Sequence, residues 1–194
     1  MLADLVLKTR SCRRFKEDRP ISLDTLKELV NLGRLSASAA NRQPLKYILS
    51  SDPVTNDKIF PCLVWAAYLK DWAGPSSGER PAAYIVILGD TSISTEFWCD
   101  HGISGQSILL GACEKGIAGC FIGAINMPRL RDVLGIDERF KIMLVIAMGE
   151  PAEKAVIEAV GQDGDIRYWR DENGIHHVPK RLLEEIIIDV YPKY

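Results

Sequence analysis

The sequence lacks the features that mark membrane-spanning, disulfide-stabilised and zinc-binding proteins. No apolar run approaches the roughly 20 residues needed to cross a bilayer. The apolar part of the N-terminus is too short for a signal peptide, and Asp4 interrupts it. The five cysteines are odd in number and form no CxxC pair, which is typical of reduced thiols. We therefore expect a cytoplasmic protein with no metal site and no membrane partner.

The chain also lacks a strong excess of either charge. Its 24 basic and 26 acidic residues give a formal net charge of -2, so the overall basic character of a nucleic-acid-binding protein is absent. Its 194 residues, 47% of them hydrophobic, suffice for one globular domain with a sizeable core. No internal repeat or low-complexity segment divides it. The sequence predicts a single domain over residues 1–194 that binds no nucleic acid.

Positive charge is nevertheless concentrated at residues 8–16, which read "KTRSCRRFK", with five basic residues and no acidic one. This stretch is compatible with a nucleic-acid-binding arm, with a solvated surface, or with a pocket for one compact anion. The arm is disfavoured because apolar residues stand inside "RSCRRF". The stretch by itself leaves the other two interpretations open.

Helical periodicity and continuous apolar runs alternate along the first 150 residues. Helices are predicted at 2–8, 22–39, 58–72, 94–116 and 127–135. Strands are predicted at 45–50, 82–89, 117–123 and 141–149. This pattern predicts an α+β domain with a sheet of four or five strands covered by helices. The run "EEIIIDV" at 184–190 also resembles a strand, and we expect it to complete a sheet, in a partner subunit.

Two further segments carry polar groups suited to binding. In "SASAANRQP" (36–44), Asn41 and Gln43 lie one residue apart and can offer paired donors and acceptors to a planar heterocycle. A helix end capped by Asn41 explains the same residues without any ligand. In "HHVPKR" (176–181), two basic residues follow a proline, and a solvated turn is the alternative interpretation.

Taken in order, these segments resemble the FMN-dependent nitroreductase family. The resemblance rests on "RSCRRF", on "SAANRQP" about thirty residues later, on the strand "IAGCFIG" ending in a glycine, and on the late "PKR". The segment 100–120 is similar to the family's central helix and the strand after it. The similarity runs from about Lys8 to Ile188 in one consistent order.

The resemblance implies an obligate homodimer with a three-layer α/β/α fold, a mixed or antiparallel central sheet and a C-terminal strand exchanged between subunits. It also implies two FMN sites in the subunit interface. It assigns no catalytic side chain and no metal. The cofactor-binding residues it implies are Arg10, Ser11, Arg13, Asn41, Gln43, Ile122, Gly123, Lys180 and Arg181.

The chemistry of these residue types suits FMN. Its phosphate carries about two negative charges at neutral pH, and the planar guanidinium of arginine binds such oxyanions through two hydrogen bonds. We expect Arg10 and Arg181 to bind the phosphate and Arg13 to lie near N1 and O2 of the ring. Gly123 allows the backbone to approach N5. We expect Lys8, Arg14 and Lys16 to be solvated and Cys12 to face the core.

The resemblance implies an oxidoreductase that passes hydride from NADH or NADPH through FMN to nitroaromatics, quinones or related small acceptors, by a ping-pong mechanism. The absence of a Rossmann fingerprint agrees with a transient nicotinamide donor. Residues 64–81 are the expected substrate-facing segment. The alternatives are a dehalogenase, azoline dehydrogenase or flavin-fragmenting enzyme of the same fold, and a non-catalytic FMN-binding or storage protein. A hydrolase is disfavoured, because none of the three histidines follows a nucleophile motif.

Overall fold

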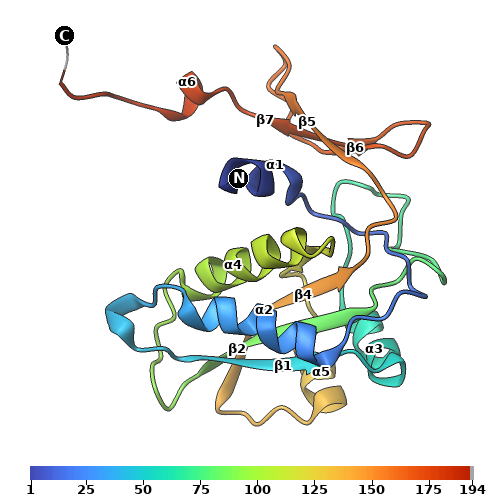
Figure 1. The fold of residues 1–194 in the computed structure, drawn as a ribbon, viewed down its shortest axis with the longest axis vertical. Helices are drawn as coiled ribbons and strands as arrows, with labels where there is room; N and C mark the ends of the chain where they lie inside the picture. Colours follow the sequence, from blue (N-terminus) through green and yellow to red (C-terminus); the bar gives the residue numbers. More distant parts are fainter. Residues whose placement is uncertain (193–194) are drawn as a thin grey trace. The chain divides into compact units, whose positions relative to one another are not determined.

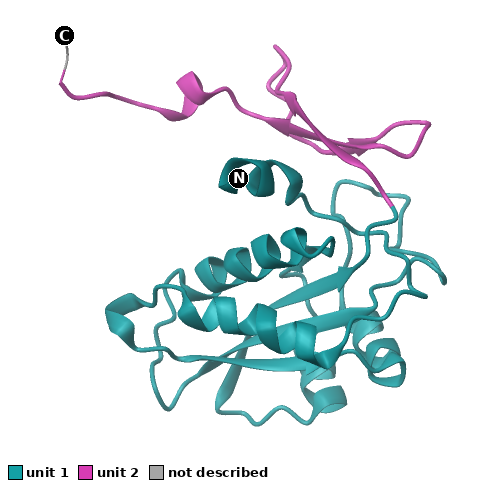
Figure 2. Cartoon of the chain, viewed as in Figure 1, with its two compact units in different colours: residues 1–152 teal, residues 153–194 magenta. Residues whose placement is uncertain are grey.

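The structure, a computed structural model, describes residues 1–192. The chain divides into two compact units, Met1–Ala152 and Glu153–Tyr194, which are drawn in different colours in Figure 2. Each unit is described by itself below.

The first unit is built on an antiparallel sheet with the strand order β1-β2-β4-β3. Its strands are β1 (Leu45–Ser50), β2 (Ala83–Asp90), β3 (Ala118–Ile122) and β4 (Phe140–Gly149). Every residue of β2 is buried, as expected for a central strand with helices on both sides. The four predicted strands of this unit are therefore confirmed, each within two residues of its expected ends.

Helices cover both faces of this sheet. The covering helices are α2 (Leu23–Leu35), α3 (Pro53–Ile59), α4 (Asp100–Glu114) and α5 (Met127–Leu134), with single 3-10 turns η1 (Ala39–Asn41) and η2 (Phe60–Cys62). The short helix α1 (Leu2–Lys8) packs against α4 and buries none of its own residues. In Figure 1, α2 and α4 lie together on one side of the sheet, with α3 and α5 at its other side. The α+β three-layer architecture expected from the resemblance is confirmed.

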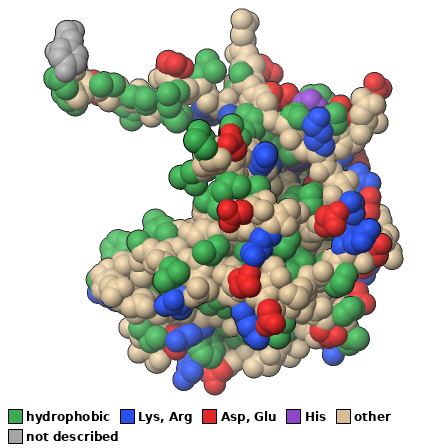
Figure 3. Space-filling view, in the orientation of Figure 1, with side chains coloured by type: hydrophobic (Ala, Val, Ile, Leu, Met, Phe, Trp, Pro, Cys, Tyr) green, Lys and Arg blue, Asp and Glu red, His purple; other side chains and the backbone are tan. Residues whose placement is uncertain are grey.

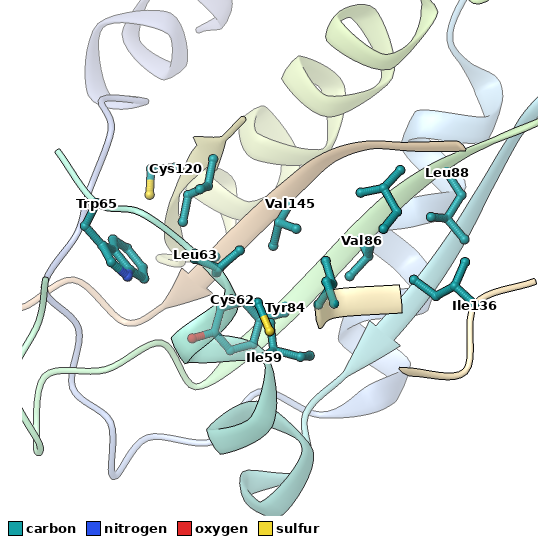
Figure 4. Packing of buried hydrophobic residues seen from close by; sticks show 14 residues of the cluster. Ile59, Cys62, Leu63, Trp65, Tyr84, Val86, Leu88, Cys120, Ile136 and Val145 are labelled. Carbon is teal, nitrogen blue, oxygen red and sulfur yellow. The ribbon is translucent and has the colours of Figure 1, made fainter. Parts of the chain in front are cut away.

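The side chains of β2 alternate between two hydrophobic clusters, because successive residues of a strand point to opposite faces. Ile85 and Ile87 pack with α2 and α4 in one cluster. Tyr84, Val86 and Leu88 pack into the other, seen in Figure 4, with the chain around η2. Burial on both faces explains why β2 reads as an uninterrupted apolar run rather than an alternating one.

Close contact between α2 and α4 depends on glycine. A Cβ atom added at Gly33 of α2 would lie 2.5 Å from Ser104 Oγ of α4. A Cβ atom added at Gly111 of α4 would collide with Leu32 of α2. The small residues of α4 thus serve the packing of this helix against its neighbours.

Two helix predictions were wrong. The helix expected at 58–72 is replaced by α3, because Asp52 accepts a hydrogen bond from the Thr55 amide at 2.9 Å and Pro53 occupies the first turn. The chain after η2 is irregular. The helix expected from residue 94 begins only at Asp100, because the Ser94 hydroxyl donates to the Glu96 carbonyl oxygen (2.7 Å) in a preceding turn.

The second unit holds a small sheet that the polar sequence did not predict. Its strands β5 (Ala155–Ala159), β7 (His176–Lys180) and β6 (Trp169–Arg170) are paired in that order, the first pair parallel and the second antiparallel. The indole of Trp169 stacks on His177, with ring centroids 4.0 Å apart. Both side chains bind the carboxylate of Glu158 at 2.9 Å. Side-chain contacts of this kind leave no apolar pattern in the sequence.

The strand expected at 184–190 is absent from the described chain. A helical turn, α6 (Leu183–Ile186), stands in its place, and Ile188 beyond it is 99% exposed. Within the described residues this run has no neighbouring strand with which to pair. No helix among residues 1–192 has the length and apolarity needed to cross a membrane.

The burial of α2 makes a prediction about stability. Leu26 is fully buried, so Leu26→Ala should lower the free energy of unfolding by about 2–5 kcal/mol through lost packing and a residual cavity. Leu23 on the same helix is 45% exposed, and Leu23→Ala should change it by less than about 1 kcal/mol. Urea denaturation measures both, and equal losses would contradict the packing described.

Candidate functional site

The basic segment at residues 8–16 is held in place by backbone hydrogen bonds and by its apolar residues. Ser11 forms a bridge with Gly119 of β3, and the Cys12 amide donates to the Gly119 carbonyl oxygen at 3.1 Å. The side chains of Cys12 and Phe15 are buried, at 5% and 0% exposure. Ser11 is exposed and Arg13 half-buried. The placement of Cys12 in the core is confirmed.

Acidic partners neutralise two of the segment's cations. The Arg14 guanidinium binds both carboxylate oxygens of Glu79, with Nε donating at 2.8 Å. Lys16 forms an ion pair with Glu150, and this contact lowers the pKa of the Glu150 carboxyl. The expectation that Arg14 is solvated was wrong, since its side chain is half-buried and paired with Glu79, which lies 65 residues away in the sequence. Lys8 and Lys16 are exposed, as expected, and Lys16 pairs with Glu150 at the surface. On the face drawn in Figure 3, Lys and Arg side chains stand among Asp and Glu side chains rather than apart from them.

Arg10 keeps part of its hydrogen-bonding capacity. Its Nη2 donates to the Val6 carbonyl oxygen at 2.7 Å and so caps the end of α1. Its Nε is buried and has no hydrogen-bond partner among the described residues. A buried donor without an acceptor costs about 1–3 kcal/mol, and an anion bound at this position would remove that cost.

The amide loop at residues 36–43 has an unusual backbone. Ala40, Asn41 and Gln43 all have left-handed conformations, with φ of 50°, 54° and 52°. Gln43 Nε2 donates to both the backbone and the side-chain oxygen of Asn41 at 3.2 Å. Left-handed conformations of non-glycine residues cost about 1–3 kcal/mol each, and they concentrate at binding sites. Both amide side chains are exposed.

A cavity of about 430 Å³ lies beside this loop, bordered by α2, β1 and the first turns of α4. Ser38 and Gln43 contribute to its wall, together with Tyr47 of β1. The Tyr47 hydroxyl and Ser104 Oγ share a hydrogen bond of 2.7 Å. Burial raises the pKa of the Tyr47 phenol, so this group stays neutral at physiological pH.

Ile122 and Gly123 stand at the carboxyl end of β3. Ile122 is buried, whereas Gly123 is exposed. A Cβ atom added at Gly123 would meet only Leu144 Cδ2, at an ordinary contact distance of 3.7 Å. Its φ lies outside the left-handed region. Neither packing within the chain nor backbone conformation therefore requires glycine at this position.

Lys180 and Arg181 belong to the second unit. Lys180 ends β7, its carbonyl oxygen accepts from the Val160 amide at 3.0 Å, and Arg181 follows it. Both side chains are exposed. Their assignment to a phosphate site stays a prediction.

Within the first unit the candidate residues form separate groups along α4. Gly119 of β3 faces Leu109 of α4, and Phe121 faces Gly105, so the helix and the strand run in opposite directions. The basic segment, bridged to Gly119, therefore lies toward the C-terminal end of α4. The amide loop lies at its N-terminal end (Figure 1). The helix rises by about 14 Å from Asp100 to Leu109, so within the first unit the basic segment and the amide loop are separate.

Comparison with known proteins gives consistent results. The profile of the Nitroreductase family matches residues 6–150. An Archaeoglobus fulgidus protein, provisionally named NADH dehydrogenase/NAD(P)H nitroreductase, is 27% identical over 176 residues, which are 86% of this chain and 96% of that protein.

Solved structures extend the comparison to the fold. A Parabacteroides distasonis protein with the same provisional name matches with a TM-score of 0.66 at 24% identity, over 79% of this chain and 88% of that one. An FMN-dependent nitroreductase from Clostridium difficile matches with a TM-score of 0.64 at 20% identity, over 77% and 87% of the two chains. The fold of this chain is therefore the fold of those proteins.

The backbone of the amide loop can be tested by substitution. Ala40→Gly should raise the free energy of unfolding by up to about 1 kcal/mol, because glycine adopts the left-handed conformation without strain. Ala39→Gly is the matched control, since Ala39 has an ordinary φ, and it should lower the same quantity by about 0.5–1 kcal/mol. Urea denaturation measures both. A loss of stability in Ala40→Gly would argue against the strained loop.

Proposed function

The chain belongs to the nitroreductase family, and from that membership and the residues described above we propose that it is an FMN-dependent oxidoreductase using NADH or NADPH as donor. We propose nitroaromatics, quinones or related small electron-poor molecules as acceptors. The observation that carries the proposal is the family match over residues 6–150, which includes every candidate residue except Lys180 and Arg181. The names of the relatives support the same chemistry.

The described residues fit an FMN phosphate on one side. Arg10 presents a buried Nε with no partner among the described residues, and the exposed Ser11 follows it on a backbone fixed by Gly119. We assign these two groups to the phosphate, with Lys180 and Arg181 as additional cations. We do not assign Arg14 to the phosphate, because its guanidinium is already paired with the Glu79 carboxylate.

Other residues fit the ring of the cofactor. We assign Arg13 to the N1 and O2 edge, where a fixed cation favours the reduced state. We assign Asn41 and Gln43 to the pyrimidine edge and the backbone of Ile122 and Gly123 to the region of N5. When bound, FMN would supply the hydride chemistry, accepting from NAD(P)H and donating to the acceptor in a ping-pong sequence. The chain supplies binding and orientation, and we assign it no proton-transferring side chain.

We propose that two copies of the chain form the site. The arginines and the amides lie at opposite ends of α4, so a site containing both groups draws them from two subunits. Uncovered apolar side chains support a dimer, including Val6 and Leu7 of α1 and Ile103 of α4, which are 44%, 60% and 42% exposed. We propose that residues 184–190 cross to the partner, where β1 stands at the edge of the sheet.

We further propose that both units act as one FMN-binding domain over residues 1–194 and that the protein is cytoplasmic. The placement of Lys180 and Arg181 in the second unit supports the first proposal. The five free cysteines support the second, because disulfides are rare in the cytoplasm.

Purified protein tests the proposed function directly. Flavin absorption bands, and NADH or NADPH oxidation that depends on an added quinone or nitroarene, are the expected results. FMN binding without NAD(P)H oxidation with any acceptor would instead favour a flavin-storage protein. Turnover of halogenated or azoline substrates would favour one of the other reactions of this fold. A colourless protein that does not bind added FMN would overturn the proposal.

The phosphate assignment makes a graded prediction. Arg10→Ala and Arg181→Ala should each weaken FMN binding by about tenfold or more, because each removes a charge-assisted hydrogen bond. Arg14→Ala and Arg42→Ala serve as controls, since Arg14 binds Glu79 and Arg42 lies 3.5 Å from Ser94 Oγ. Fluorescence titration with FMN measures the dissociation constants. Equal losses in all four variants would show that the phosphate is bound elsewhere.

The proposed dimer makes a separate prediction. Ile188 is 99% exposed in the single chain, so Ile188→Asp should leave the subunit fold intact but weaken the dimer by roughly a hundredfold if this segment is buried against a partner. Val54→Asp places the same charge on α3, where Val54 is 63% exposed, and should not affect association. Analytical ultracentrifugation distinguishes the outcomes. An unchanged dimer in Ile188→Asp would exclude the crossing segment from the interface.

A further inference from the structure

A buried carboxylate fastens the amide loop to α4. Asp100, the first residue of the helix, is only 3% exposed. Its Oδ2 accepts a hydrogen bond from Ser38 Oγ at 2.6 Å, and its Oδ1 accepts from the Ala39 amide at 3.0 Å. Both oxygens of one carboxylate are thus used to hold two consecutive residues of the loop.

The hydroxyl of Ser38 also binds Gln43, a residue of the candidate site. Ser38 Oγ accepts a hydrogen bond from the backbone amide of Gln43 at 2.9 Å while it donates one to Asp100. The hydroxyl proton is directed at the carboxylate, so a lone pair of the oxygen is left for the Gln43 amide. Asp100, Ser38 and Gln43 therefore form a continuous relay of hydrogen bonds, which joins residues 38 and 39 to α4 and to the backbone of Gln43 at the end of the loop.

Apart from this relay, little apolar packing holds the loop in place. No residue from Arg34 to Gln43 is buried, and the 430 Å³ cavity lies beside the loop. Three non-glycine residues of the loop adopt left-handed conformations, which the loop would relax if it were released. Asp100 itself is well anchored, because α4 buries Ile108 and Ala112 in the core and its N-terminal end favours a negative charge.

We propose that Asp100 is a positioning residue for flavin recognition. It acts through Ser38 to fix the backbone of the loop, and so holds the side-chain amides of Asn41 and Gln43 in their binding geometry. The inference rests on the proposed function, since it assumes that these amides contact FMN. Asparagine at position 100 cannot fully replace the carboxylate. Its carbonyl oxygen can keep the bond from the Ala39 backbone amide, but its amide nitrogen can only donate to Ser38 Oγ, so that bond reverses its direction and loses the negative charge that strengthens it.

The test compares hydroxyl-deleting and hydroxyl-retaining variants by FMN titration of the cofactor-free protein. Ser38→Ala should weaken FMN binding by about tenfold, because it removes the bond between Ser38 and Asp100. Asp100→Asn should weaken FMN binding by a smaller factor, because it replaces a charge-assisted bond with a neutral one. Ser38→Thr should bind like the wild type, because it retains the hydroxyl and suits the extended backbone at this position. The double variant Ser38→Ala/Asp100→Asn should bind no more weakly than Ser38→Ala alone, because both changes act on the same bond.

Ser36→Ala is the matched control. Ser36 lies in the same loop and its hydroxyl also reaches α4, donating to Ser107 Oγ at 2.7 Å, but it does not contact the relay. The absorption spectrum of bound flavin should shift in Ser38→Ala and not in Ser36→Ala. Circular dichroism of the cofactor-free variants identifies any that fail to fold, and Ser38→Thr and Asp100→Asn conserve shape for that reason.

The possible results separate the two proposals. Wild-type protein that does not bind FMN would overturn the proposed function, and this inference with it. Wild-type protein that binds FMN while Ser38→Ala and Ser36→Ala bind equally well would overturn the positioning role alone. A Ser38→Thr variant as weak as Ser38→Ala would also overturn it, because the hydroxyl would then not be the active feature.

Discussion

The close packing of α4 is the constraint on which the rest of the first unit depends. This helix touches α2 through Gly33 and Gly111, and it touches β3 through Gly105 and Gly119, where added Cβ atoms would collide with neighbouring atoms. Protein interiors are densely packed, so contacts of this kind leave a helix little freedom to shift. The position of α4 in turn sets the separation between the basic segment and the amide loop, since one lies toward each of its ends.

Electrostatic pairing then determines which cations are available for a ligand. The basic segment carries five positive charges in nine residues, and an unpaired cluster of this density would repel itself. Glu79 and Glu150 each pair with one cation, so two of the five charges are neutralised by residues outside the segment. Arg10 is left with a buried Nε that no described residue satisfies. Arg14 serves the structure through its pair with Glu79, whereas Arg10 keeps a donor for an anion. Composition alone cannot distinguish these two roles.

The sequence predicted the sheet well because continuous apolar runs are a local property, and it predicted the site less well because the site depends on distant contacts. The runs at 82–89 and 141–149 are strands for the reason expected, burial on both faces. The aromatic residues of 58–72 imitated a helical period, but Trp65 reaches the core from an irregular segment. Asp100 was missed because its partners lie 61 and 62 residues away, and Arg14 because Glu79 lies 65 residues away. No spacing within a motif indicates such pairs.

The C-terminal run at residues 184–190 also depends on contacts distant in the sequence, but here the contact is missing within the described chain. Strand-forming residues need an adjacent strand, since β-propensity largely reflects packing against neighbours, whereas a helical turn is satisfied by its own backbone. Within the described chain, residues 182–187 have only local bonds, from the Glu185 amide to the Leu182 carbonyl oxygen and from the Ile187 amide to the Leu183 carbonyl oxygen. The turn leaves Ile186, Ile187 and Ile188 at 61%, 46% and 99% exposure, a loss of burial that no contact in the second unit offsets. An apolar run of this kind gains stability only where another surface covers it. In the dimer proposed above, the edge of β1 in the second copy would supply both the covering surface and the backbone partners that a strand requires.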